Sequence, residues 1–497
     1  MALNDLAAAA EDADAGGSLY PLASGLVEPA LARVAPEEGM RLVSAMRPRT
    51  WLRLDAELRG LRHWFRPGDQ WQQLTDAAWA GSNPLALLLV ACSGDGRMRQ
   101  RAVLTPLMRS DQRLLPLLVI RSADWVEQVR VDARRELFEA LYAADGDGLI
   151  RAAGVAMEMR DWSRGDFAVA AVSEALRTGS HRALDAARAS DDIQVRRLAY
   201  RLWLESGHAN SDAVIRAALT EGDVVCQRLC AKTAVSVAVR DRQRDTLDRL
   251  LSARFARVRV EALAGLVQIG QPEAAEDVLA DRSAMMRGTA QWAMRRAGRD
   301  AAEQYRAMLA SGDDSRLRSV VAGLSECGTV DDAESLAGFL RHARPRMRAE
   351  AVRAVRRLGG NLSQIAEMLT DPAPAVVRPV VAALRNRPDL VSAERLWELL
   401  GADQPQHIRR AAFKLLIARD TWTRIAADLG LVADTDDKLR AYARSDLNGW
   451  LDLDAATTYE MPPQSAHDRL RRLIDAAEPD IGTANARLLR WHLSVSR

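Results

Sequence analysis

Few residues in this chain have the types and spacing that enzyme chemistry requires. The sequence contains no glycine-rich nucleotide-binding loop, no His-Glu-x-x-His zinc motif and no Cys-x-x-Cys pair. Its seven histidines are scattered, and no two stand four residues apart, the helical spacing that would aim both at one metal ion. We therefore predict no catalytic residues, no metal site and no cofactor, which favours a protein that is not an enzyme.

Two short motifs, a cysteine pair and an aspartate–glycine segment, could bind a metal ion or could be purely structural. Cys226 and Cys230 stand four residues apart on an expected helix, but no third and fourth ligand lies nearby in the sequence, so buried structural cysteines are favoured over a metal site. The segment from Asp145 to Gly148 resembles the start of a calcium loop, yet its twelfth position is Ala156 and not a glutamate. A turn between helices is the favoured interpretation of that segment.

The composition indicates a folded chain with almost balanced charge. Hydrophobic residues make up 48% of the 497 residues, and 69 Lys+Arg stand against 67 Asp+Glu, which excludes a wholly disordered chain and a polyanion binder acting through bulk charge. Residues 1–17 lack the basic and apolar regions of an export signal, and only four cysteines occur. We expect a cytoplasmic protein. The apolar run 85–92 is too short to span a bilayer, so no integral membrane association is expected.

One motif recurs along the chain: an apolar residue, an arginine, and an alanine three residues after the arginine. Its spacing averages 31 residues between Arg99 and Arg409. Clear copies lie at Arg99, Arg130, Arg196, Arg259, Arg287, Arg348 and Arg409, and weaker variants lie at Arg164, Arg228, Arg318 and Arg378. A fixed period of this length is typical of repeat proteins, in which each unit buries its apolar face against its neighbours.

Turn signals frame each copy of the motif. Aspartates such as Asp95, Asp192 and Asp223 precede the arginine at the place of a helix N-cap. Glycines follow it by ten or eleven residues, where a left-handed residue would end the helix; they are Gly207, Gly270, Gly298, Gly328 and Gly359. The sequence thus predicts two short helices per repeat and an all-α fold, a right-handed α-solenoid of about eleven helix pairs.

The segments 256–270 and 344–359 resemble HEAT repeats, in the short variety known from phycobilisome lyases. The resemblance covers about residues 85–420 and concerns architecture, because such repeats serve scaffolds, lyases and nucleic-acid enzymes alike. It implies an ion-pair ladder between adjacent repeats, with Asp192 pairing with Arg196 and Asp313 with Arg318. Pro379 inside the Arg378 unit and the weak motif at Arg164 predict irregular units there.

The two ends differ from the repeats. Residues 1–84 are predicted to form an N-terminal helical cap with a frayed start, and residues 421–497 a C-terminal helical cap around the array 85–420. The N-terminal segment contains Trp51, Trp64, Trp71 and Trp79. Capping of the open core is the favoured role for these tryptophans, and a docking surface is the alternative.

The outward face of the arginine helices has an asymmetric charge. If the motif arginine is position zero, then positions plus one, plus five and plus eight point away from the core. The only acidic residue at these positions is Glu326. The predicted binding residues are Arg135, Arg197, Arg201, Arg295, Arg353, Arg356, Arg410 and Lys414, together with Trp292, which lies among them.

Two classes of function follow from this basic stripe. The first is a non-catalytic scaffold or adaptor whose concave groove holds an acidic or extended segment of a protein partner, with Trp292 as an anchor. The alternative is a nucleic-acid-binding protein that grips phosphates with the same stripe. A lyase-like enzyme remains a third, weaker interpretation.

Overall fold

The computed structural model describes residues 3–32, 36–60, 69–179, 181–207, 209–459, 462 and 464–494. Every regular element in these residues is helical, which confirms the predicted all-α fold. The chain forms two compact units, Met1–Gly265 and Leu266–Arg497, and their boundary falls inside helix α19. Within the described residues, none of the helices combines the length and apolarity needed to cross a membrane.

The first unit contains α1 to α18 and most of α19, and its α-helices are from five to 17 residues long. They are α1 (Leu3–Asp14), α2 (Tyr20–Gly25), α3 (Val27–Leu31), α4 (Pro36–Ala45), α5 (Pro48–Leu58), α6 (Asp69–Trp79), α7 (Pro84–Ala91), α8 (Gly96–Val103), α9 (Pro106–Ser110), η2 (Gln112–Leu114), α10 (Leu115–Arg121), α11 (Glu127–Ala143), α12 (Gly146–Glu158), α13 (Asp166–Thr178), α14 (His181–Arg188), α15 (Ile193–Glu205), α16 (Ser211–Thr220), α17 (Val224–Arg240), α18 (Arg244–Leu251) and α19 (Ala256–Gln268).

The second unit continues the same alternation of short and longer helices. Its elements are η3 (Pro272–Val278), α20 (Ala284–Arg296), α21 (Ala301–Ala310), α22 (Leu317–Cys327), α23 (Asp332–Ala337), η4 (Gly338–Arg341), α24 (Pro345–Arg357), α25 (Leu362–Ala366), η5 (Glu367–Thr370), α26 (Pro374–Leu384), η6 (Pro388–Leu390), α27 (Ala393–Leu399), α28 (Gln406–Leu416), α29 (Thr421–Leu429), α30 (Asp437–Gly449), η7 (Trp450–Asp454), η8 (Ala455–Thr457), α31 (Gln464–Ile481) and α32 (Thr483–Ser494).

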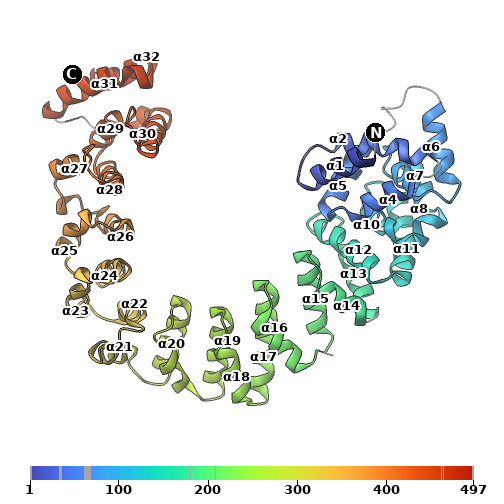
Figure 1. The fold of residues 1–497 in the computed structure, drawn as a ribbon, viewed down its shortest axis with the longest axis horizontal. Coiled ribbons are helices and arrows are strands. Elements are labelled where there is room, and N and C mark those ends of the chain that lie inside the picture. Colours follow the sequence, from blue (N-terminus) through green and yellow to red (C-terminus); the bar gives the residue numbers. More distant parts are fainter. Residues whose placement is uncertain are drawn as a thin grey trace. The chain divides into compact units, whose positions relative to one another are not determined.

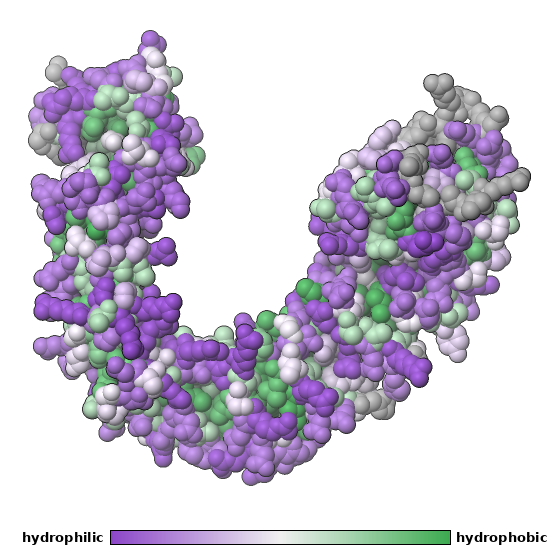
Figure 2. Space-filling view, in the orientation of Figure 1, coloured by the Kyte–Doolittle hydropathy of each residue, from purple (hydrophilic) through white to green (hydrophobic). Residues whose placement is uncertain are grey.

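Within each unit the helices stack as successive pairs, as a solenoid requires (Figure 1). The helix that carries the arginine motif is called the repeat helix below. Most repeat helices pack on their pair partner and on a neighbouring repeat helix, as α24 does on α23, α22 and α26. Hydrophilic residues cover most of the face shown in Figure 2, and hydrophobic residues reach the surface in smaller, separate areas.

The buried side chains of the repeat helices recur at a regular spacing. In the clear copies from Arg130 to Arg409, positions minus one, plus three and plus seven of the repeat helix are buried, as are Val195, Ala199 and Trp203 around Arg196. This spacing places three side chains on one face of the helix. It confirms the predicted inward face for those copies. Around Arg99 only Ala102 at plus three is buried, because Met98 is half-buried and position plus seven lies beyond the end of α8.

The same spacing corrects the register of two weak copies, and a third weak copy is no repeat helix. In α17 the buried residues at minus one and plus three are Cys226 and Cys230, so position zero is Gln227 and Arg228 is at plus one. In α26 the buried residues Val376 and Val380 place Arg378 at plus one in the same way. Arg164 lies in the turn before α13 and outside any repeat helix.

The repeat arginine binds the turn that precedes its own helix. Its Nη1 donates to the carbonyl oxygen six residues earlier, at distances of 2.6 to 3.0 Å. This contact recurs at Arg99, Arg130, Arg196, Arg259, Arg287, Arg348 and Arg440. Arg440 follows Leu439 and precedes Ala443, so the motif continues into the segment that we expected to be the C-terminal cap.

Ion pairs link adjacent repeats, but not through the predicted partners. Arg348 reaches Asp371 of the following unit at 2.8 Å, and Arg409 likewise reaches Asp434. The predicted pair Asp192–Arg196 is wrong, because the Asp192 carboxylate caps α15 by accepting from the backbone N–H groups of that helix. Asp313 is likewise bound to Ser315 and not to Arg318.

The turn signals are largely confirmed. Asp95, Asp192 and Asp223 are N-caps of α8, α15 and α17. Asp145 caps α12, as expected for a turn between helices. Four of the five predicted glycines have positive φ values, namely Gly207, Gly270, Gly298 and Gly359. Gly328 has φ −78° and ends α22 in an extended conformation.

The N-terminal helix α1 is packed against the rest of the first unit. Helix α1 begins at Leu3 and buries Leu6, Ala10 and Ala13, and Arg53 donates to the carbonyl oxygens of Ala13 and Gly17. The frayed start that we predicted is therefore not seen in the described residues. These apolar side chains lie four and three residues apart on one helical face, which suffices to dock the helix.

The tryptophans near the ends mostly lie in or beside the core. Trp51, Trp422 and Trp450 are buried, and the ring of Trp79 lies 4.3 Å from the Arg101 guanidinium carbon. Their positions fit the predicted capping role. Trp64 lies outside the described residues.

A change of side-chain size tests the two faces of a repeat helix. Ala262 is fully buried at plus three of α19, so Ala262→Phe should overpack the core and lower the free energy of unfolding by roughly 1 to 3 kcal/mol. Arg353→Ala at an exposed plus-five position of α24 should change it little. Thermal denaturation of both variants measures this difference, and equal losses would contradict the assignment of the faces.

Candidate functional site

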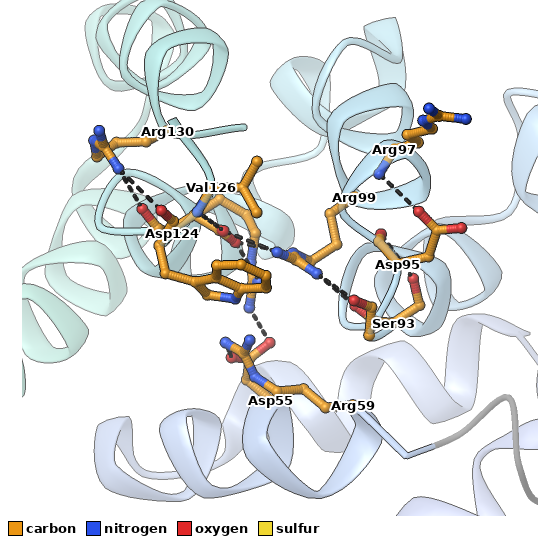
Figure 3. Close-up of polar contacts among 12 residues, drawn as sticks. Asp55, Arg59, Ser93, Asp95, Arg97, Arg99, Asp124, Val126 and Arg130 are labelled. Atoms are coloured by element: carbon orange, nitrogen blue, oxygen red, sulfur yellow. Dashed lines mark hydrogen bonds and ion pairs between the residues drawn. The ribbon is translucent and has the colours of Figure 1, made fainter. Parts of the chain in front are cut away.

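Charged side chains of α5, of α8 and of α10 with the turn after it contact one another in the first unit (Figure 3). Asp124 accepts from Arg99 Nε and Nη2, each at 2.9 Å, and from Arg121 Nη1 at 2.9 Å. Asp55 of α5 contacts Arg121 and accepts from Arg59 at 2.9 Å. The side chains of Arg99, Arg121 and Asp124 have no exposed surface.

This cluster holds helices together and offers nothing to a ligand. It joins α5 of the N-terminal segment to α8 and to α10 with the turn after it. Burial alone would raise the pKa of Asp124, but the hydrogen bonds from Arg99 and the charge of Arg121 outweigh burial and lower that pKa. A fully paired carboxylate without solvent contact is a structural element.

A concave surface of different character lies in the second unit, between repeat helices α26, α28 and α30. Its cavity has a volume of about 500 Å³. The lining residues are Pro374, Val377, Arg378 and Val381 of α26, Gln406, His407, Arg410, Ala411 and Lys414 of α28, and Lys438 and Tyr442 of α30. We call this surface the basic groove, because its lining contains four Arg and Lys residues and no carboxylate.

The register of the repeats explains which of these cations are free. A plus-one arginine points at the N-terminus of the next repeat helix, and it pairs with the N-cap there when that residue is an aspartate. Arg197 pairs with Asp223 at 2.8 Å, and Arg410 pairs with Asp436 at 2.8 Å. Arg378 faces α28, whose N-cap is Pro405, so no carboxylate is supplied.

Two of the three lysines in the chain lie in the basic groove. Lys414 is at plus five of α28, and Lys438 is in the first turn of α30. Both side chains and that of Arg378 are exposed, and among the described residues none of the three has a carboxylate within ion-pair distance. Tyr442 stands beside them with 54% of its surface exposed.

A second cavity, of about 260 Å³, continues the groove between α28 and α30. It shares Arg410, Lys414 and Tyr442 with the first cavity. Its remaining lining includes the apolar residues Phe413, Ile417 and Leu439. Arg424 and Asp446 also line it, and they neutralise each other through hydrogen bonds of 2.7 and 3.0 Å.

The predicted binding residues divide between the two units. Arg135, Arg197 and Arg201 belong to the first unit, and Trp292, Arg295, Arg353, Arg356, Arg410 and Lys414 belong to the second. Only Arg410 and Lys414 line the basic groove. Arg197 and Arg410 are half-buried in ion pairs, which gives them a structural role that the charge count alone did not reveal.

Other predicted residues are exposed but partly engaged. Arg353 pairs with Glu350 at 2.9 Å, and Arg356 donates to the carbonyl oxygen of Ala382 at 3.1 Å. Trp292 is 41% exposed, and the Arg296 guanidinium carbon lies 6.0 Å from its ring centroid. Neither Trp292 nor Arg295 lines the groove.

The sequence analysis missed two groups of outward-facing residues, one in α17 and one in α11. With Gln227 at position zero, Arg228 and Lys232 take the outward positions plus one and plus five of α17, and both are exposed. In α11 the outward positions beside Arg135 are apolar: Val131, Phe138 and Tyr142 are 56%, 63% and 89% exposed. The exposed apolar face of α11 was not predicted, because the sequence analysis considered only the charged residues at the outward positions.

The structure gives no support for redox or metal chemistry in the cysteines. Burial raises the pKa of both Cys226 and Cys230 to about 12, so the reactive thiolate is absent at neutral pH. In the part of the chain that the structure describes, no cluster of three or more His, Cys, Asp or Glu side chains could bind a metal ion.

Comparison with known proteins adds little. No protein-family model and no curated protein sequence matches the chain. Among solved structures it is similar to a chain in the structure of Kap95p with RanGDP, with a TM-score of 0.29 and 12% identity over 99% of this chain and 74% of that one. It is also similar to importin beta, with a TM-score of 0.32 and 12% identity over 95% of this chain and 64% of the other. Values this low assign no function.

Proposed function

We propose that this protein is a non-catalytic scaffold that holds an acidic segment of a protein partner in the basic groove. The observation that carries this proposal is the set of three exposed cations, Arg378, Lys414 and Lys438, around one concave surface without a carboxylate in its lining. In a chain with 69 basic and 67 acidic residues, most cations can find a partner. Cations that stay free in a concavity attract an anionic ligand.

The floor of the groove favours a peptide as that ligand. Val377, Val381 and Ala411 form its apolar part, and Tyr442 offers an exposed ring with a hydroxyl group. An extended peptide can place apolar side chains on this floor while its carboxylates face the cations. The concentration of charge in one short groove also fits a peptide better than a duplex, which presents phosphates along its whole length.

Single-stranded nucleic acid is the second candidate, and one observation favours it. The exposed Tyr442 ring stands next to Lys438 and Lys414, which together form a stacking platform with cations for the adjacent phosphates. Salt dependence separates the two candidates. Phosphate binding falls log-linearly and steeply with salt, whereas a peptide held partly by apolar contacts retains affinity.

Neutralising the three free cations should abolish most of the binding. In the variant Arg378→Gln/Lys414→Gln/Lys438→Gln, we expect the affinity for a fluorescein-labelled glutamate-rich peptide to fall roughly tenfold or more, because each exposed charge contributes up to about 1 kcal/mol. Fluorescence anisotropy at two salt concentrations measures this. The same titration with a thymidine 20-mer tests the second candidate.

The control variant is Arg353→Gln/Arg356→Gln. It removes two exposed arginines of the same unit that do not line the groove, and it should keep the affinity of the unaltered protein. Equal losses in both variants would show that a broad basic surface and not the groove binds the peptide. Circular dichroism confirms that both variants fold.

A further inference from the structure

This inference rests on the proposed function and specifies the ligand. We propose that the basic groove recognises a two-part peptide segment, in which a short acidic stretch lies over α26 and α28 and one bulky apolar side chain enters the cavity between α28 and α30. The two cavities differ in chemistry and share a common wall.

The first cavity selects negative charge. Arg378, Arg410, Lys414 and Lys438 line it, and no Asp or Glu is among its lining residues. Asp436 offsets the charge of Arg410, which leaves three uncompensated cations. A ligand with two or three carboxylates would match this excess, and guanidinium groups can bind carboxylates through two hydrogen bonds.

The second cavity selects an apolar side chain. Phe413, Ile417 and Leu439 line it. The charge of Arg424 is matched by Asp446 and that of Arg410 by Asp436, so Lys414 is the one free cation among the residues that line this cavity, against three in the first. An aromatic or aliphatic side chain that enters this cavity removes its own apolar surface from water. Among these three residues the half-buried Ile417 adds exposed surface to that contact, since Phe413 and Leu439 are already buried.

The common wall fixes the spacing of the two parts. Arg410, Lys414 and Tyr442 border both cavities, so one ligand can occupy both without leaving the surface. Packed helices lie about 8 to 10 Å apart, and an extended peptide advances about 3.3 Å per residue. The apolar anchor should therefore stand about three residues from the acidic stretch.

Four labelled peptides test this inference on the full chain. One carries four glutamates and a phenylalanine three residues away, and a second has the reverse order of the two parts. A third replaces the phenylalanine by alanine, and the fourth replaces the glutamates by glutamine. We expect the better of the two orders to bind about tenfold more tightly than the alanine peptide, since burial of a large apolar side chain has that effect. The glutamine peptide should bind far more weakly than either.

A protein variant isolates the second cavity. Ser445 is exposed and lines only that cavity, so Ser445→Trp should fill it and remove the advantage of the phenylalanine. The affinity for the alanine peptide should stay the same. Asn448→Trp is the matched control, because Asn448 is exposed on the same helix and lines neither cavity.

Each outcome has one meaning. If the alanine peptide binds as tightly as both phenylalanine peptides, the two-part recognition is wrong while the proposed function stands. If Asn448→Trp removes the advantage as fully as Ser445→Trp, the anchor lies elsewhere and the inference is again wrong. If none of the acidic peptides binds, or if only the thymidine 20-mer binds in the groove, the proposed function fails as well.

Discussion

Replacing Asp124 by alanine should lower the free energy of unfolding of the first unit by about 3 to 5 kcal/mol, because the change leaves the buried charges of Arg99 and Arg121 without their common partner. Both arginine side chains are fully buried. Arg121 would retain Asp55, whereas Arg99 would retain only the carbonyl oxygens of Ser93 and Gly94. Thermal denaturation and hydrogen exchange of α5, α8 and α10 measure the loss.

An exposed ion pair supplies the control. Asp389 pairs with Arg387 at 2.7 Å, and both side chains are at least half exposed. Asp389→Ala should leave the melting temperature nearly unchanged, since solvent already screens that pair. A loss for Asp124→Ala no larger than for Asp389→Ala would mean that the buried cluster contributes nothing to stability.

Replacing Asp428 by asparagine should have the opposite effect and stabilise the second unit. Asp428 is fully buried in α29, and neither carboxylate oxygen accepts a hydrogen bond from a described residue. Burial, followed by the charge of the neighbouring Asp446, raises its pKa to about 9. The folded protein therefore keeps this carboxyl group protonated at neutral pH.

The sign of the pH dependence follows from linkage. Between the ordinary value of 3.8 and about 9, the folded state binds a proton that the unfolded state has released. The contribution of Asp428 to stability therefore falls as pH rises through this window. At pH 7 the protonation of Asp428 in the folded state lowers the free energy of unfolding by up to about 4 kcal/mol. The reason is that pH 7 is about three units above the pKa of the unfolded state, and each unit corresponds to about 1.36 kcal/mol.

The asparagine side chain in Asp428→Asn cannot ionise, and it is nearly the same size as the protonated carboxyl group that it replaces. The substitution should thus raise the melting temperature at pH 7 to 8 and flatten the decline in stability between pH 5 and 8. Asp437→Asn, at an exposed position in the first turn of α30, is the control and should keep that decline. A slope in Asp428→Asn equal to that of the unaltered protein would contradict the assignment.

Much of the architecture could be predicted because each repeat carries its own signals. An arginine at position zero, an alanine at plus three, an N-cap aspartate before and a glycine after lie within about twenty residues. The predicted register was wrong in α17 and α26, where the arginine is at position plus one and not at position zero. The apolar residues four apart, Cys226 with Cys230 and Val376 with Val380, would have placed both helices correctly.

Only part of the candidate site could be predicted from the sequence. Arg410 and Lys414 were predicted from their outward positions, but whether such a cation is free depends on the next repeat. Asp223 follows Arg197 by 26 residues and Asp436 follows Arg410 by 26, and this distance is a signal that we overlooked. No local pattern could predict the contact between Asp55 and Arg121, since 66 residues separate them.

That separation also has a consequence for how the chain acquires its structure during synthesis. Most ion pairs between repeats join residues 22 to 26 positions apart, so each repeat can consolidate as soon as the next one has left the ribosome. The N-terminal helices are different, because Asp55 needs Arg121, and Glu37 needs Arg113, 76 residues later in the chain. Asp55 and Glu37 thus wait for the segment from α8 to α10 before their charges are matched. We therefore expect slower translation of residues 60–124 to lengthen the time for which α4 and α5 remain exposed to chaperones and proteases.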